Sequence, residues 1–261
     1  MSTSRILPDP DARTVREPLP PADLEGVSED LMLLALLHER EPTAELITEL
    51  RHAPPEDWFN LSLAGPAFEE ARTHMLEGLA VIGDPPSRST LDLLAADYAA
   101  IYLTFHYRAA PTESVWRDED GLERQDAMFE VRRVYARHRL QVADWRLRSD
   151  DHLVSELMFL AALLQSRDDA VCREAAIFLR DHMLVWVPLF AARVASRCQL
   201  QFFAGTSLLT AVYLHTLGDL LASATGTDMT PPELKFAKAS VGAQPTIDCG
   251  GKRTSPPRRS P

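Results

Sequence analysis

Apolar residues recur at intervals of three and four residues almost everywhere between positions 28 and 224, and this periodicity is the strongest constraint on the fold. No stretch alternates apolar and polar residues in the way that a half-buried β-strand requires. Each segment therefore has one apolar face, which is stable only when it is buried against other helices. We predict an all-α protein, a single-domain bundle of about eight to nine helices that occupies residues 28–225.

Both ends of the chain lack such an apolar face. Residues 1–27 contain five prolines among scattered charges, and residues 226–261 end in GGKRTSPPRRSP. Segments of this composition bury too little apolar surface to offset the entropy that is lost on folding. We therefore predict flexible tails at 1–27 and 226–261.

Polar residues and prolines predict where several helices begin or break. Ser28, Ser89 and Ser149 each precede an apolar run, and a serine hydroxyl can accept a hydrogen bond from a free amide of the first helical turn. Pro188 lies within a long apolar segment, and proline removes one hydrogen bond from a helix interior. We expect helices to begin at the three serines and a kink or break near His182.

The charge and the cysteine content argue against several classes of function. The formal net charge is −11, and it is concentrated in the body because the C-terminal tail is net basic. A body of that sign repels phosphate backbones, so we predict no nucleic acid as the main partner. The three cysteines are widely spaced and form no C-x-x-C pair. They indicate neither a disulfide framework nor a zinc knuckle, and they fit the reducing cytoplasm.

No segment predicts insertion into a membrane. The first thirty residues lack the apolar stretch of a secretory signal. The long uncharged window at 198–218 is interrupted by glutamine, threonine, serine and histidine residues. We predict a buried helix there and no stable membrane insertion.

The stretch RSDDHLVSELMFLAALL, residues 148–164, places two carboxylates and an imidazole directly before an almost wholly apolar run. These side chains can form a helix cap, a metal or proton-transfer site, or part of a binding pocket. With Ser149 as the cap, Asp150 and Asp151 lie at the positive end of the helix dipole, which explains both carboxylates. This cap does not explain His152, so the metal or proton-transfer site and the binding pocket both remain open as alternatives.

A catalytic or metal site in this stretch would be incomplete. His152 and Glu156 are four residues apart, a spacing that can hold a metal, but no third ligand is evident. Asp151 and His152 can form a dyad, but the sequence identifies no nucleophile. Neither G-x-x-x-x-G-K-[ST] nor G-x-G-x-x-G occurs. A hydrolase or nucleotide-using enzyme centred on Asp151, His152 and Glu156 is therefore the rival hypothesis, and we predict no metal and no cofactor.

Aromatic residues gather around the longest predicted loop. Residues 108–121 contain Pro111 and predict a loop of about a dozen residues, which is long for a compact helical domain. Tyr98 and Tyr102 precede this loop, and Trp116 lies within it. Such side chains either line a groove for an apolar peptide or pack in the core.

Five segments occur in a distinctive order: LAADYAAIYL, APTESVWRDEDG, FEVRRVYARHRL, DDHLVSELMFLAALL and FLRDHMLVWVPLFAARV. This order resembles the redox-enzyme maturation chaperones of the TorD, DmsD and NarJ family, over roughly residues 28–222. The resemblance implies an all-helical cytoplasmic chaperone and not an enzyme. It also implies a client, the catalytic subunit of a molybdoenzyme, which we expect to be of the dimethyl sulfoxide reductase type. Such a chaperone binds its client, often through the twin-arginine leader, and prevents export before the molybdenum cofactor is inserted.

The resemblance also implies a binding site. The pair Asp151 and His152 matches the Asp-His of the family's E-P-x-D-H hinge motif, and the loop matches the pattern P-x-x-S-V-[WY]. An aromatic residue at position 98 contributes to the leader pocket. The residues that we predict to bind a peptide are Tyr98, Tyr102, Pro111, Ser114, Trp116, Asp151, His152 and Glu156.

Two parts of the family pattern are changed in this chain. The Glu-Pro of the hinge is Arg148-Ser149, and the Trp-Gly of the loop is Thr112-Glu113. We hypothesise that Glu113 supplies the displaced carboxylate. The hinge before Asp150 is compatible with a monomer or with a domain-swapped dimer.

Overall fold

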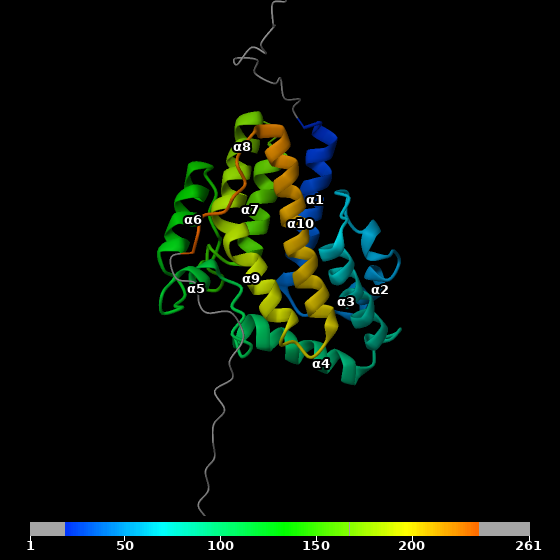
Figure 1. Ribbon diagram of the computed structural model, residues 1–261. Coiled ribbons are helices and arrows are strands. Elements are labelled where there is room, and N and C mark those ends of the chain that lie inside the picture. Colours follow the sequence, from blue (N-terminus) through cyan, green and yellow to red (C-terminus); the bar gives the residue numbers. More distant parts are fainter. Residues whose placement is uncertain (1–18, 167, 235–261) are drawn as a thin grey trace, which may run out of the picture.

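The structure, a computed structural model, describes residues 19–166 and 168–234 (Figure 1). Within these residues every regular element is helical, and the β-type pairing is limited to one isolated bridge between Thr112 and His152. The predicted all-α fold class is therefore confirmed.

The α-helices in chain order are α1 (Pro21–Glu39), α2 (Ala44–Leu50), α3 (Pro66–Ile82), α4 (Arg88–Tyr98), α5 (Glu113–Arg117), α6 (Asp126–Arg137), α7 (Leu153–Gln165), α8 (Asp169–Phe178), α9 (Leu184–Ala195) and α10 (Gln201–Thr225). A 3₁₀ turn, η1 (Pro55–Asp57), and two π-helical turns, η2 (Ala99–Leu103) and η3 (Leu179–Met183), complete the described elements. Because α8, η3 and α9 are continuous, the described residues contain nine separate α-helices.

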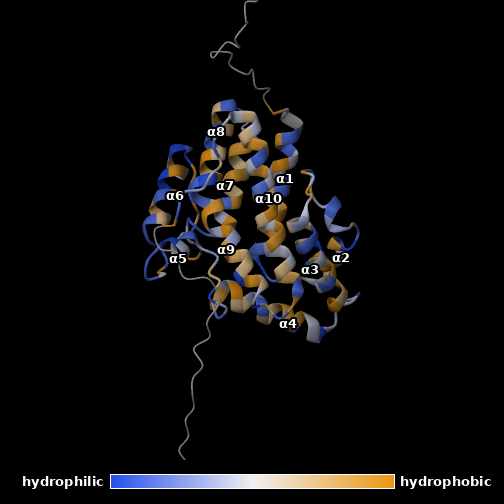
Figure 2. Ribbon diagram, in the orientation of Figure 1, coloured by the Kyte–Doolittle hydropathy of each residue, from blue (hydrophilic) through white to orange (hydrophobic). Residues whose placement is uncertain are grey.

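Helix α10 lies at the centre of the bundle and packs against α3 and α9, while α1 packs against α7. Helix α4 crosses the lower end of the bundle in Figure 1, and α5 and α6 lie on the side away from α2 and α3. The buried apolar residues form one contiguous cluster from Leu24 to Leu221. This continuity supports the proposal of a single domain. The hydropathy colours of Figure 2 show the apolar residues concentrated where the central helices meet.

Two glycines allow α3 and α10 to approach backbone to backbone. A Cβ atom on Gly78 would lie 2.2 Å from the backbone nitrogen of Phe202, and one on Gly205 would lie 2.6 Å from Cα of Met75. No side chain fits into these distances, because the neighbouring atoms belong to the opposing backbone. The crossing of α3 and α10 therefore requires glycine at both positions.

The predicted break near His182 does not occur, because α8, η3 and α9 form one continuous helix, but a π-helical turn replaces the regular α-helix there. The π-helical turn η3 contains His182, and Pro188 lies inside the helix that follows. Proline cannot donate to the carbonyl four residues earlier, and π-helical turns are one way in which a helix accommodates such a fault.

The N-terminal boundary of the predicted helical body is wrong. Helix α1 begins at Pro21, and proline is tolerated in the first turn because the amide that it lacks has no partner there. Leu24 and Val27, which fall in the predicted tail, are buried. Ser28 lies inside α1, where its hydroxyl donates to the carbonyl of Ala161 in α7 (3.3 Å). Pro20 thus directly precedes α1, and Pro21 is its first residue.

Two other predicted N-caps are also displaced. Ser87 and not Ser89 caps α4. Helix α7 is capped by His152 in place of Ser149, because the Ser149 hydroxyl is hydrogen-bonded to Asp151. Where several polar residues adjoin, tertiary contacts select the one that caps.

The C-terminal boundary of the last helix agrees with the prediction. Helix α10 ends at Thr225, and Gly226 adopts the left-handed conformation (φ 72°) that commonly ends a helix. Met229 packs against the core, so the first part of the predicted tail lies on the body. The predicted tail residues 1–18 and 235–261 lie outside the described residues.

Two apolar segments bear on the membrane prediction. The window at 198–218 falls mainly in α10, which is a buried helix as predicted. The continuous stretch 169–195 is long and apolar enough to cross a membrane, and 67% of its apolar window is buried inside the fold. The core helix of a soluble protein passes the same test, so the stretch is only weak evidence for a membrane span.

Candidate functional site

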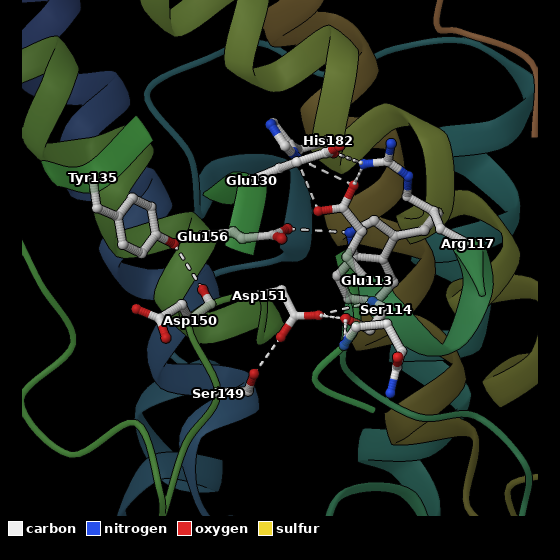
Figure 3. Close-up of polar contacts among 12 residues, drawn as sticks. Glu113, Ser114, Arg117, Glu130, Tyr135, Ser149, Asp150, Asp151, Glu156 and His182 are labelled. Atoms are coloured by element: carbon white, nitrogen blue, oxygen red, sulfur yellow. Dashed lines mark hydrogen bonds and ion pairs between the residues drawn. The ribbon is translucent and has the colours of Figure 1, made fainter. Parts of the chain in front are cut away.

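A buried carboxylate joins the loop before α5 to the segment before α7 (Figure 3). Asp151 Oδ2 accepts hydrogen bonds from the backbone amide (2.8 Å) and the hydroxyl (2.5 Å) of Ser114. The Ser149 hydroxyl donates to the other carboxylate oxygen. A carboxylate in a protein interior is stable only when such donors replace its water. Asp151 therefore holds the start of α5 against the chain that leads into α7.

Backbone hydrogen bonds connect the same two segments, 111–116 and 149–153, which together we call the joint. The amide of Glu113 donates to the carbonyl of Asp151 (2.9 Å), and the amide of Leu153 donates to the carbonyl of Pro111 (2.9 Å). Trp116 completes the joint from within α5, because its indole N–H donates to the carbonyl of Ala110 (2.8 Å). The structure thus brings together the predicted loop residues and the predicted hinge residues.

The prediction that Asp151 binds a peptide directly is nevertheless contradicted by its burial. Asp151, Ser114 and Glu156 have no exposed surface, and Trp116 is only 8% exposed. The carboxylate oxygens of Asp151 already accept hydrogen bonds from serine residues of the chain itself. A leader arginine could reach this carboxylate only if the loop opened, so Asp151 positions the site and does not contact a peptide in this conformation.

The hypothesis that Glu113 supplies a carboxylate for the leader is also wrong. Glu113 is completely buried and accepts hydrogen bonds from Arg117 Nη1 (2.7 Å) and His182 Nδ1 (2.9 Å). Arg117 also pairs with Glu130 of α6 (3.1 Å). Glu113 therefore ties α5 to η3 in the interior and faces no ligand.

Glu156 is a buried acid beside other buried acids. Its Oε2 accepts a hydrogen bond from the indole N–H of Trp186 (3.1 Å), and its Oε1 has no partner among the described residues. Burial, together with the negative charges of Glu113 and Asp151, raises the pKa of Glu156 well above its usual value. Burial therefore favours the protonated form of the Glu156 carboxyl, and in that form it can serve as a donor.

Replacing Glu156 with glutamine is expected to raise the free energy of unfolding at pH 8 and to change it little near pH 4.5. The native state keeps this proton above the pH at which the unfolded chain releases it, so the wild type loses stability as the pH rises above 4.5. The loss is at most about 1.4 kcal/mol per pH unit, and glutamine has no proton to lose. Urea unfolding at intervals from pH 4.5 to 8 measures the difference. Glu69→Gln, at an exposed position of α3, is the control, and a Glu156→Gln difference that does not change with pH would contradict the assignment.

The three residues of the rival catalytic hypothesis have separate partners. Asp151 is bonded to serines, Glu156 to Trp186, and His152 Nδ1 accepts from the amide of Val154 (3.1 Å). No His, Cys, Asp and Glu side chains in the described ranges form a group of three that could hold a metal. This geometry does not support the dyad or the His152–Glu156 metal pair of the rival hypothesis.

A pocket of about 410 Å³ opens beside the joint. Its wall contains three of the predicted site residues, Tyr98, Tyr102 and His152, together with Thr112 from the loop. The two tyrosine rings lie 4.7 Å apart between centroids, and the Tyr98 hydroxyl donates to the carbonyl of Glu39 (2.7 Å). Thr112 Oγ1 is buried and has no hydrogen-bond partner in the described part of the chain. A ligand could satisfy this atom only if the pocket wall moved to uncover it.

His152 contributes a donor to this pocket. Because Nδ1 accepts the amide of Val154 as the N-cap of α7, the proton of the neutral ring is on Nε2. Burial, and secondly the neighbouring Arg148, lower the pKa of His152 to about 3, so the ring is neutral at pH 7. His152, which the predicted Ser149 cap did not explain, is thus itself the N-cap of α7.

An apolar groove of about 690 Å³ lies between α7 and the loop that connects α6 to α7. Its lining includes Leu140, Met158 and Phe159. Leu140 is 42% exposed and Met158 is 51% exposed, and both line this one groove. Exposed apolar surface of this kind is typical of a binding site for another chain.

The pocket and the groove share a ridge formed by Glu39, Leu147 and Arg148. Arg148 Nη1 lies 3.1 Å from Glu39 Oε1, and Leu147 is 86% exposed. One exposed ion pair and one exposed leucine thus lie between a polar pocket and an apolar groove. A bound chain could extend from one into the other.

Sequence reasoning missed three residues of this site. Glu39 ends a helix far from the hinge in the sequence, so no local pattern connects it to Arg148. Thr112 was noted only as a departure from a family motif. Met158 has a signal in the sequence, because an apolar residue that falls on the outward side of a helix is unusual, but the almost wholly apolar run around it conceals that position.

The fold and the site together define a class of protein, an all-helical binding protein whose polar pocket adjoins an apolar groove. Residues 65–192 match the family model described as nitrate reductase delta subunit. This match confirms the resemblance noted from the sequence, and members of this family are molybdoenzyme maturation chaperones. No curated protein matches the chain.

The matched segment is shorter than the resemblance noted from the sequence. It runs from the residue before α3 into α9, and it includes the α5 joint and α7. It omits α1 and α10, so Glu39 lies outside it.

Proposed function

We propose that this chain binds the catalytic subunit of a molybdenum-cofactor oxidoreductase of the dimethyl sulfoxide reductase type through that subunit's twin-arginine leader. It holds the subunit in the cytoplasm, assists cofactor insertion and prevents premature export. The family match supports a molybdoenzyme as the client. The observation that carries the proposal of a leader is the polar pocket that adjoins the apolar groove.

A leader has the same two-part chemistry, because its basic start is followed by an apolar stretch. The pocket contains the carboxylates of Glu39 and Glu123, which attract the basic part once the neighbouring guanidinium of Arg148 is displaced. Arg124 also lines the pocket. The groove offers Leu140, Met158 and Phe159 to the apolar part. The negative charge of the whole chain favours the encounter with a basic segment at low salt.

The predicted site residues divide into two groups in this proposal. Tyr98, Tyr102 and His152 line the pocket and contact the leader. The others form the buried joint and its interior neighbours, and they position the pocket wall: Pro111, Ser114, Trp116, Asp151 and Glu156.

Replacing Met158 with glutamate is expected to weaken binding of a synthetic leader peptide at least tenfold, which corresponds to about 1.4 kcal/mol. Met158 is 51% exposed on α7, so the charge is tolerated by the fold but repels an apolar segment in the groove. Isothermal titration calorimetry with an Arg-Arg peptide that continues into an apolar stretch measures the affinity.

Val81→Glu is the matched control, because Val81 is 66% exposed on α3 and does not line the groove. Equal affinity of both variants and the wild type would count against the groove as the leader site. Binding of the catalytic subunit that survives deletion of its leader would indicate that the chaperone docks on the mature subunit instead.

A further inference from the structure

The ion pair on the ridge has an unusual position. Glu39 is the last residue of α1, where the helix dipole disfavours a negative charge and leaves the carboxylate in need of a cation. Arg148 supplies this cation, because its Nη1 lies 3.1 Å from Glu39 Oε1 although the two residues are 109 positions apart in the sequence. In the family pattern that the sequence resembles, a glutamate occupies the place of Arg148.

This pair differs from two other arginine–carboxylate pairs near the site. The carboxylates of Asp150, bound by Arg132, and of Glu113, bound by Arg117, are almost or completely buried. The Glu39 and Arg148 side chains are 42% and 33% exposed. An exposed pair contributes little to stability, so a second guanidinium can replace the first without loss to the fold.

The surroundings of Glu39 suit a guanidinium from another chain. The rings of Tyr98 and Tyr102 line the same pocket, and a guanidinium stacks on such rings. These groups lie in the pocket with Glu39, whereas Asp151 and Glu113 are buried behind its wall.

We propose that Glu39 is the carboxylate that binds an arginine of the client leader. In the free protein Arg148 pairs with Glu39 in place of that client arginine, and we call this role of Arg148 the internal stand-in. This inference rests on the proposed function and adds to it the residue that recognises arginine. Glu39 of α1 then supplies the carboxylate that is missing from the hinge, where Arg148 replaces the glutamate of the family pattern. A client must displace Arg148 in order to bind. The expected contact is a charge-assisted, bidentate one, which Lys cannot reproduce.

Replacing Glu39 with glutamine is expected to weaken binding of the Arg-Arg leader peptide about tenfold and to abolish the preference for it over a Lys-Lys peptide of otherwise identical sequence. Replacing Arg148 with methionine, which removes the internal competitor, is expected to strengthen binding about threefold. Calorimetry with the full chain and both peptides measures these changes. Glu41→Gln is the matched control, because Glu41 is an exposed neighbour that does not line the pocket. Urea midpoints equal to that of the wild type show that the variants are folded.

The outcomes separate this inference from the proposed function. A wild-type chain that binds neither peptide would overturn both. Binding that Met158→Glu weakens but Glu39→Gln leaves unchanged would overturn this inference alone. Weaker binding in Arg148→Met than in the wild type would show that Arg148 contacts the leader or shapes the pocket, and it would overturn the role of internal stand-in. Loss of the preference for arginine in Glu39→Gln alone, with stronger binding in Arg148→Met, supports the proposal.

Discussion

Replacing Asp151 with alanine is expected to lower the free energy of unfolding by about 3 kcal/mol. The substitution leaves the buried amide and hydroxyl of Ser114 and the hydroxyl of Ser149 without their acceptor. Each buried donor that loses its partner costs about 1–3 kcal/mol, and partial relaxation reduces the sum. Urea unfolding monitored by circular dichroism measures the change.

The control for this prediction is Asp144→Ala. Asp144 is an exposed aspartate that accepts the backbone amide of Arg146 in the loop before α7, so its loss is expected to cost less than about 1 kcal/mol. Ser114→Ala removes one hydroxyl donor and keeps the amide, and an intermediate loss is expected. An Asp151→Ala variant as stable as Asp144→Ala would contradict the role of this carboxylate in holding the joint.

Replacing Gly205 with alanine is expected to destabilise the fold by about 3 kcal/mol, the upper part of the range for overpacked interiors. The added Cβ would lie 2.6 Å from the backbone nitrogen and from the Cα of Met75 in α3. Backbone atoms cannot move aside as a side chain can, so α3 and α10 must separate. Thermal and urea unfolding measure the loss.

Gly218→Ala in the same helix is the matched control. Its Cβ would lie 3.4 Å from the flexible end of Met229, which is ordinary contact, so the higher helix propensity of alanine is expected to stabilise by about 0.5–1 kcal/mol. The two substitutions make the same chemical change in one helix, and their difference isolates the close approach. Equal effects at both positions would contradict the account of the crossing.

The family resemblance brought together segments that do meet in the fold, but several residues that it assigns to peptide binding are buried. The loop at 108–121 and the hinge do meet, as the motifs implied. The motifs did not reveal that Asp151 is buried. A sequence motif does not distinguish a residue that contacts a ligand from one that positions the pocket wall. The exposed fraction of each side chain separates these two roles, and it depends on which helices pack over the residue.

The sequence by itself determined the all-α fold and the end of the helical body at residue 225, where α10 ends. These features follow from the spacing of apolar residues and from proline and glycine within a few turns, so they depend on neighbours along the chain. The tertiary structure alone decided that Asp151 is buried, that His152 caps α7 and that Glu39 meets Arg148. Those outcomes depend on contacts between segments far apart in the sequence, and the energy of a charge or a cap is set by what the folded chain places around it.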